Sequence, residues 1–307
     1  MSVRHGAGAA GEDGDDGGRE AASRYVFGDS AIAAERLDRL AEVFEPTTRA
    51  FLQREAPRRP GLAVDLGCGP GHTTRLLGAI TAAEAVVGLD QSPAFVAAAS
   101  QAAGRSGAGR SGAGASSVGS PAPGAGGSDP GEKRESYRLH DVRRVPFPCG
   151  AADVVFARLV LAHLPLVSDV VAAWLTQVRP GGVLLVEEVE RIDTDQPVLA
   201  RYLAIVTERL RRQGSEIVAG PALAALAPAG TEVRHHLASL RPPLGDTVEL
   251  FGLNLMVLDA DPVMDELLPP RERSELAGQL AALRTDRRSG TIEWTLRQTA
   301  MRADGEA

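Results

Sequence analysis

Residues 64–73 read Val-Asp-Leu-Gly-Cys-Gly-Pro-Gly-His-Thr and carry the strongest structural signal in the chain. The apolar run 62–66 predicts a buried strand, and 72–80 has the pattern of a helix. Between them, Gly67, Gly69 and Gly71 allow positive φ angles and a close approach of the backbone to a ligand. In open α/β sheets, ligands bind beyond the carboxyl ends of the strands. The segment therefore predicts a strand, a ligand-binding turn and a helix.

The flanking sequence extends this unit into an alternating α/β pattern. A second strand over 85–89 ends at Asp90, and a helix over 93–103 follows with Ser92 as its N-cap. Alternating strands and helices indicate a parallel sheet with right-handed crossovers. Further strands are expected over 137–140, 152–156, 183–186, 231–240 and 292–301, and further helices over 170–178, 195–213, 247–258 and 271–283.

The N-terminal part predicts two helices. Leu37, Leu40, Ala41 and Phe44 follow helical spacing, Pro46 is expected to end that helix, and a second is expected over Thr47–Glu55.

Two segments rich in Gly, Ala and Ser, 1–22 and 104–136, are interpreted as a disordered tail and a disordered insertion. Strands of one sheet are expected on both sides of the insertion. We therefore expect a single domain over 23–303. It consists of a helical lead-in (23–60), a ligand-binding core (61–190) and an acceptor-side half (191–303), with 304–307 as a tail.

The composition narrows the possible functions. The 307 residues carry a formal net charge of −7 and are only 4% aromatic, which argues against nucleic acid as a partner. No run approaches the ~20 apolar residues of a membrane span, and the first residues do not resemble a secretory signal. The two cysteines are too few for a cysteine-rich metal site, and His235 and His236 point to opposite faces of a strand, so no metal is expected. A cytoplasmic protein, monomeric or homodimeric, is the resulting prediction.

The glycine spacing and its flanking acids indicate the kind of nucleotide. Asp90 lies about 20 residues beyond Gly71, where a carboxylate binds ribose hydroxyls in nucleotide-binding α/β folds. The pattern is G-x-G-x-G and not the dinucleotide G-x-G-x-x-G. Asp65 would repel a pyrophosphate but suits a cationic ligand. S-adenosylmethionine has no phosphate and carries an ammonium and a sulfonium, so the charge argument favours it.

With these residues, the chain resembles the class I S-adenosylmethionine-dependent methyltransferases, in particular bacterial members that act on small molecules. A looser match covers 25–28 and 35–37. The resemblance implies a Rossmann-like, mostly parallel seven-stranded sheet with an antiparallel last strand, helices on both faces and a helical cap. Besides the glycine turn, the matching segments are 87–92, 140–142 with 145–147, 153–158, 161–164 and 178–184.

The resemblance also implies cofactor-binding roles. Asp65 would position the methionine ammonium, Gly67, Cys68, Gly69 and Gly71 would form the turn under the cofactor, and Asp90 would bind the ribose. The other implied contacts are Gln91 and Asp141 with Val142 at the adenine, Arg158 at the cofactor or the substrate, and Tyr25, with Phe27, as a cover. Cys68 is interpreted as a small packing residue, since nothing marks it as an activated nucleophile.

The reaction implied is methyl transfer to a small-molecule acceptor by in-line displacement. His163 is a candidate general base, or a histidine bonded to backbone at a helix start. Glu187, with Glu188, is a candidate for binding the acceptor or for acting as a base. The alternatives are a catalytically silent cofactor-binding regulator, an NAD-dependent oxidoreductase, and the same fold turned to decarboxylation or hydroxylation.

Overall fold

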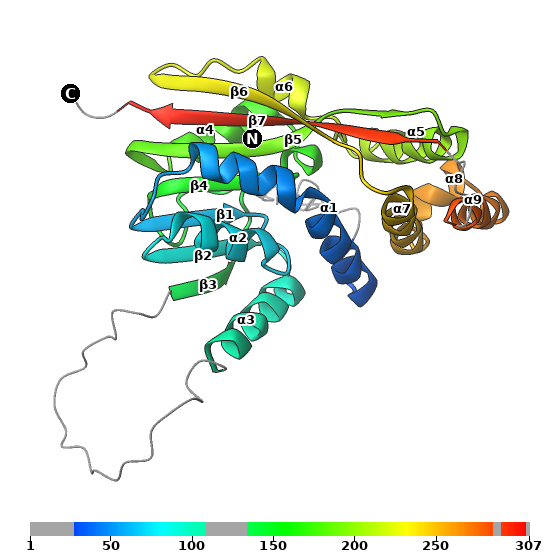
Figure 1. Cartoon of the computed structure of the whole chain (residues 1–307), viewed down its shortest axis with the longest axis horizontal. Coiled ribbons are helices and arrows are strands. Elements are labelled where there is room, and N and C mark those ends of the chain that lie inside the picture. Colours follow the sequence, from blue (N-terminus) through cyan, green and yellow to red (C-terminus); the bar gives the residue numbers. More distant parts are fainter. Residues whose placement is uncertain (1–27, 109–133, 285–289, 305–307) are drawn as a thin grey trace, which may run out of the picture.

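The protein contains one seven-stranded sheet in the order β3-β2-β1-β4-β5-β7-β6. The structure, a computed structural model, describes residues 28–108, 134–284 and 290–304. β7 pairs antiparallel with both β5 and β6, and the other pairs are parallel, which confirms the predicted fold class (Figure 1). The strands are β1 (Leu62–Leu66), β2 (Ala85–Asp90), β3 (Arg134–Leu139), β4 (Ala152–Arg158), β5 (Val178–Thr194), β6 (Thr231–Leu240) and β7 (Ile292–Ala303).

Helices cover both faces of the sheet because alternate strand residues point to opposite sides. On one face, Ala63 of β1 packs with side chains of α1 and α2. On the other, Val64 packs with α4 and α6, including Trp174. The helices are α1 (Ala31–Glu55), α2 (His72–Thr81), α3 (Pro93–Ala108), α4 (Val167–Leu175), α5 (Pro197–Arg211), α6 (Gly220–Ala224), α7 (Leu244–Leu258), α8 (Pro262–Leu267) and α9 (Pro270–Leu283), with a 3-10 turn over Leu161–His163.

A third cluster of buried side chains lies beyond the end of the sheet. It joins α1 to α5, α7, α8 and α9 and to the start of β7. Figure 1 shows α5, α7, α8 and α9 gathered on the right, beside the long β5 and β7. This group is the helical cap.

The prediction of two N-terminal helices was wrong, because α1 continues through Pro46. Proline removes one helical hydrogen bond and usually ends or bends a helix. Here the hydroxyls of Thr47 and Thr48 donate to the carbonyl of Phe44 at 2.8 and 3.0 Å. Burial of Phe44 and Phe51 holds the two parts of the helix against the core, and α1 is visibly bent in Figure 1.

Several predicted boundaries also differ. Residues 104–108 belong to α3 and 134–136 to β3, whereas 109–133 of the expected insertion, like the 1–22 tail, lie outside the described residues. β5 does not end near Glu187 and Glu188 but continues to Thr194, because β7 pairs with it that far. α4 begins and ends about three residues earlier than predicted.

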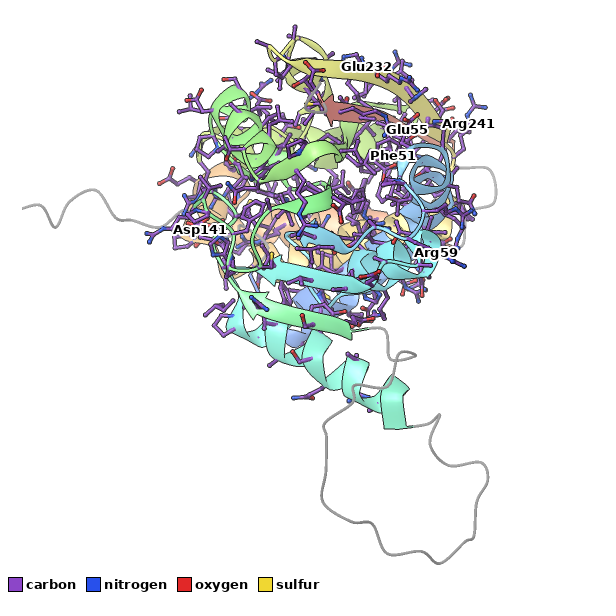
Figure 2. All side chains as sticks on the ribbon, turned by 90° about the vertical axis from the view of Figure 1, so that its left-hand side faces the viewer. Phe51, Glu55, Arg59, Asp141, Glu232 and Arg241 are labelled. Atoms are coloured by element: carbon purple, nitrogen blue, oxygen red, sulfur yellow. The ribbon has the colours of Figure 1, made fainter. Side chains whose placement is uncertain are left out.

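The parallel strands bring four loops to one edge of the sheet. β1 is paired with both β2 and β4, so the order of the chain reverses at β1. Figure 2 shows Asp141, which follows β3, on the opposite side of the molecule from Arg59, which precedes β1. The edge beyond the carboxyl ends is therefore the place where a ligand site is expected. Among the described residues, no helix is long and apolar enough to cross a membrane.

Candidate functional site

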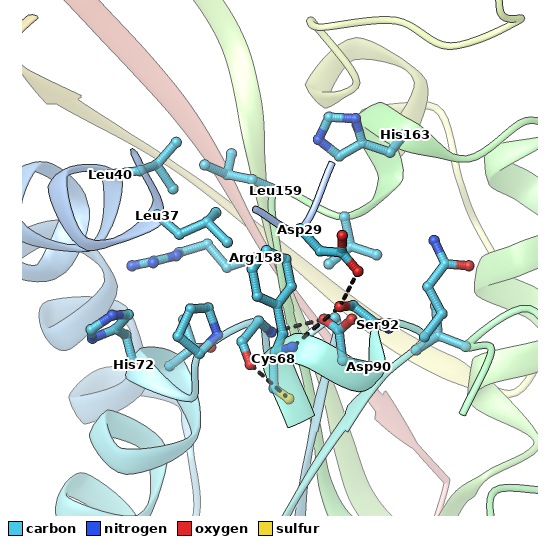
Figure 3. A pocket seen from close by; sticks show the side chains of 18 of the residues that line it. Asp29, Leu37, Leu40, Cys68, His72, Asp90, Ser92, Arg158, Leu159 and His163 are labelled. Carbon is cyan, nitrogen blue, oxygen red and sulfur yellow. Dashed lines mark hydrogen bonds between the residues drawn. The ribbon is translucent and has the colours of Figure 1, made fainter. Parts of the chain in front are cut away.

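A cavity of about 650 Å³ lies at the carboxyl ends of the parallel strands. The loops that follow β1 to β4 form most of its wall, and α1 closes one side (Figure 3). Predicted site residues that line it are Gly67, Cys68, Gly69, Asp90, Gln91, Asp141, Val142, Arg158 and His163. These residues come from distant segments of the sequence and line one common cavity. Tyr25 and Phe27 lie outside the described residues.

The glycine turn has the backbone that only glycine adopts without strain. Gly67, Gly69 and Gly71 have φ of 63°, 51° and 87°. A Cβ on Gly67 would lie 2.7 Å from a methyl of Val160, in the loop after β4. A Cβ on Gly71 would collide with the ring of Tyr137, and Gly71 does not line the cavity. Gly71 therefore serves the packing of the turn, whereas Gly67 and Gly69 form its cavity wall.

Asp90 ties the glycine turn to the end of β2. One carboxylate oxygen accepts from the backbone N–H of Gly69 and the other from that of Ser92, both at 2.8 Å (Figure 3). Burial raises the pKa of Asp90 despite these bonds. The backbone N–H of Gln91 also contributes to this site. A carboxylate has about four acceptor positions, so it can accept a further hydrogen bond from a ligand hydroxyl.

Asp65 lies beneath the cavity and not in its wall. It is 1% exposed, and the hydroxyls of Thr73 and Thr74 both donate to its Oδ2 at 2.6 Å. Its Oδ1 accepts no hydrogen bond from any described residue. Burial raises the pKa of Asp65 to about 6. A buried carboxylate with an unused oxygen favours a cation nearby, and the buried guanidinium of Arg158 is close enough to lower the pKa of Asp65.

Cys68 lines the cavity as a protonated thiol. Burial raises its pKa, with Asp65 and Asp90 adding to the effect. Its Sγ donates to the carbonyl of Gly69. The arrangement agrees with the packing interpretation of Cys68, because the thiolate form is disfavoured.

Asp141 is held in place by its own loop. Burial tends to raise its pKa, but bidentate hydrogen bonds from Arg143, at 2.8 to 3.1 Å, outweigh burial and hold the pKa below its usual value. The next residue, Val142, is fixed by the indole N–H of Trp174, which donates to its carbonyl at 2.8 Å. This loop presents a fixed acceptor at one end of the cavity.

Glu187 lies in a closed polar network behind the cavity. Its carboxylate accepts from the hydroxyl of Thr48 and from the side-chain amide of Gln298, and burial raises its pKa. Arg158, which lines the cavity, donates weakly to the same Thr48 hydroxyl at 3.4 Å. Glu187 does not line this cavity. Its network reaches Arg158, which does line the cavity, through the hydroxyl of Thr48.

His163 lies in the loop after β4, and Glu188 of β5 binds the backbone of the same loop. Burial, with the nearby charge of Arg36, lowers the pKa of His163 to about 3, so the imidazole is uncharged near neutral pH. Burial raises the pKa of Glu188 to about 8. One of its oxygens accepts from the backbone N–H groups of Val160 and Leu161 at 2.8 and 2.7 Å. Glu188 therefore holds the loop that carries His163.

Arg36 lines this cavity and a smaller one beside it, although no role was predicted for it from the sequence. Arg36 is 5% exposed and donates to Asn254, which is 218 residues away in the chain. A contact between α1 and α7 leaves no local pattern. The sequence signal that could have found it is the helical spacing of Arg36 to Leu40 and Phe44, which places this arginine on the apolar face of α1.

Comparisons with known proteins show which family the core of the chain is similar to. Residues 64–186 match the family described as methyltransferase domain. A trans-aconitate 2-methyltransferase of Streptomyces avermitilis is 31% identical over 150 residues, covering 49% of this chain and 47% of that protein. A trans-aconitate 2-methyltransferase of Methylobacterium radiotolerans is 29% identical over 223 residues, which cover 68% of this chain and 73% of that protein.

The chain thus spans about half the length of the first relative. A solved structure from Bacillus halodurans, named as a candidate methyltransferase, shares the fold with a TM-score of 0.50 and 15% identity. The alignment covers 84% of this chain and 99% of that one.

Proposed function

We propose that the chain transfers a methyl group from S-adenosylmethionine to a small carboxylate, because residues 64–186 match the methyltransferase domain family. The observation that carries the proposal is the cavity at the glycine turn, where Asp90 presents both oxygens beside Gly67 and Gly69. We also propose that the lead-in, the core and the helical cap form one domain over 23–303.

The residues present fit this cofactor. The cavity of about 650 Å³ is within the range of small-molecule sites, roughly 300–1,000 Å³. Asp90 suits a ribose diol, and Asp141 with Val142 and Gln91 suits an adenine. The unused oxygen of Asp65 favours a cationic ligand over a pyrophosphate. S-adenosylmethionine meets each of these requirements.

In this reaction the protein aligns the acceptor with the methyl group and excludes water. When bound, S-adenosylmethionine supplies an electrophilic methyl group, which moves to the acceptor oxygen while the electron pair of the broken C–S bond stays on sulfur. The glycine turn, the loop after β4 and α1 surround the place where the groups meet. Holding reactants in line contributes much of the rate in such transfers.

The site favours an acceptor that is already an anion. His163, the candidate base, has a pKa of about 3 and would be a weak base. Glu187 is enclosed by Thr48 and Gln298. A carboxylate needs no deprotonation, so it suits a site without a tuned base. The activity named for the relatives, trans-aconitate methylation, also has a carboxylic acid as acceptor.

Methyl-labelled S-adenosylmethionine tests the proposal with a panel of carboxylic acids that includes trans-aconitate. We expect label that is released by mild alkali, because methyl esters hydrolyse and methyl ethers and amines do not. Alkali-stable label would show that the acceptor is not a carboxylate. A chain that binds the cofactor tightly and leaves every acid unlabelled would instead be a silent cofactor-binding protein.

A further inference from the structure

A row of polar side chains crosses the sheet beneath α1, at the level where β4 ends. Arg158, the last residue of β4, is paired in register with Glu187 of β5, and Glu187 is paired with Gln298 of β7. Residues paired in register point to the same face of a sheet. The preceding row on this face is apolar, since Phe156 and Leu185 pack with α1 and α2. Arg158, Glu187 and Gln298 are named here the polar row, and Arg158 brings it to the wall of the larger cavity.

The carboxylate of Glu187 is fixed from two sides. The hydroxyl of Thr48 in α1 donates to its Oε2, and the side-chain amide of Gln298 donates to its Oε1 at 2.7 Å. The same amide also donates to the backbone carbonyl of Thr47 at 3.1 Å. Glu187 and Thr48 are fully buried, and Gln298 is 1% exposed. Each oxygen of this carboxylate thus has a donor, one supplied by α1 and the other by β7.

Arg158 is held mainly by its place beside Glu187. Among the residues that the structure describes, its one hydrogen bond is a long one to the hydroxyl of Thr48, at 3.4 Å. Burial lowers the pKa of Arg158, and the charge of Glu187 is the largest effect that opposes burial, followed by that of Asp65. A buried charge without a counter-charge is costly, so the guanidinium depends on these carboxylates. Thr48 links the two groups, because its hydroxyl donates to Glu187 and accepts from Arg158.

The guanidinium of Arg158 lies on the side of the larger cavity that α1 closes. Figure 3 shows Arg158 directed toward α1 and away from Asp90. Burial raises the pKa of Asp65, which lies beneath the glycine turn, and the charge of Arg158 opposes this effect. A cation and an anion are therefore near each other beside the turn. The amino-acid end of S-adenosylmethionine carries a carboxylate and an ammonium, so its two charges match this pair.

We propose that Glu187 is the positioning residue for Arg158, holding the guanidinium where it binds the carboxylate of the methionyl end of S-adenosylmethionine. This inference rests on the proposed function and gives Glu187 a role that needs no contact with cofactor or acceptor. Thr48 and Gln298 take part, because they donate to the two oxygens of Glu187 and fix its direction. β7 does not line the larger cavity and contributes to the site through Gln298.

A pair of ligands that differ only in the carboxylate gives the test. The purified chain is titrated calorimetrically with S-adenosylhomocysteine and with its decarboxylated analogue, in which hydrogen replaces the carboxylate. We expect S-adenosylhomocysteine to bind at least about tenfold more tightly, because the analogue loses a charge-assisted bond. Arg158→Met should reduce this ratio of affinities to less than about threefold. A wild-type ratio near one, or an unchanged ratio in Arg158→Met, would overturn the proposal.

Glu187→Gln keeps the shape of the side chain and removes its charge. We expect it to lower the ratio at least about threefold, because Thr48 no longer donates to a carboxylate and Arg158 loses its fixed position. In the Arg158→Met protein the same change should leave the ratio unaltered. Loss of stability alone would not change the ratio, since both ligands bind the same folded protein. A wild-type ratio in Glu187→Gln would contradict a positioning role, and a higher ratio would show instead that Glu187 competes with the ligand for the guanidinium.

Two further variants test the link between Glu187 and Arg158. Thr48→Val removes the hydroxyl between them and should lower the ratio as Glu187→Gln does. Glu190→Gln is the matched control: Glu190 lies on the same strand and pairs with Arg297 at 2.6 Å, and neither residue lines the larger cavity. This control should keep the wild-type ratio. An equal fall in Glu190→Gln and Glu187→Gln would contradict a specific link to Arg158.

The same titrations distinguish failure of this inference from failure of the proposed function. If S-adenosylhomocysteine does not bind the wild-type chain, the proposed function fails. If it binds, and its preference over the analogue survives in both Arg158→Met and Glu187→Gln, the cofactor stands and its carboxylate is held elsewhere, so the inference fails.

Discussion

Replacing Gly67 with alanine tests the link between the glycine turn and the loop after β4. Gly67 has φ of 63°, where an alanine pays about 1–2 kcal/mol. The added methyl would also lie 2.7 Å from a methyl of Val160, so Val160 must move. Together these effects predict a loss of about 1–3 kcal/mol in the free energy of unfolding. At roughly 2–4 °C per kcal/mol, the Tm should fall by about 2–12 °C.

The variant should also bind cofactor more weakly, because Gly67 and Val160 both line the larger cavity. Thermal unfolding and calorimetric titration with S-adenosylhomocysteine measure the two effects. Gly252→Ala is the matched control: Gly252 lies inside α7, and no atom outside its own helix turn is within 4 Å of the new Cβ. We expect this control to gain about 0.5–1 kcal/mol. A Gly67→Ala protein with wild-type Tm and wild-type affinity would refute the geometry of the turn.

Three further changes have defined outcomes. Asp90→Ala should weaken S-adenosylhomocysteine binding at least several-fold, since charge-assisted bonds to ligand and to Gly69 are lost; unchanged affinity would remove Asp90 from the site. The pKa of Glu188 is raised from 4.5 to about 8, so its stabilising effect is complete below about pH 4.5 and is lost as the pH rises through 8. Glu188→Gln should therefore flatten the decline of the free energy of unfolding with pH over that range. Chemical unfolding at several pH values measures this, and an equal decline in both proteins would contradict the prediction. Replacing 109–133 by a short Gly-Ser linker should leave soluble, cofactor-binding protein, because the sequence of this segment is low in complexity and strands of one sheet lie on both sides of it; loss of soluble protein would show that the segment is structural.

The strands of the core could be predicted because each is a short buried run next to a turn signal. Val64 and Ala63 face opposite clusters, so the run 62–66 is apolar on both sides and is easily identified. Pro46 was misread because packing of Phe44 and Phe51 outweighs the local preference of proline. The short helices α6 and α8, with five and six residues, are too brief to show a helical period.

The part of the cavity at the glycine turn could be predicted because its residues follow strands directly. Asp90 and Asp141 come at strand ends, and parallel strands bring such residues to one edge. The part of the cavity beside Arg36 could not be predicted in this way. The bond between Arg36 and Asn254 joins α1 to α7 across 218 residues, and only the folded cap brings them together. For Glu187, the sequence gives its type and position but not its enclosure by Thr48 and Gln298.

Calorimetric titration of the purified chain with S-adenosylmethionine, S-adenosylhomocysteine and NAD is the most direct test of the proposed cofactor. We expect micromolar affinity for the two adenosyl compounds and none for NAD, because Asp65 and the G-x-G-x-G turn suit a cation and not a pyrophosphate. Binding of NAD without binding of S-adenosylhomocysteine would contradict S-adenosylmethionine as the cofactor.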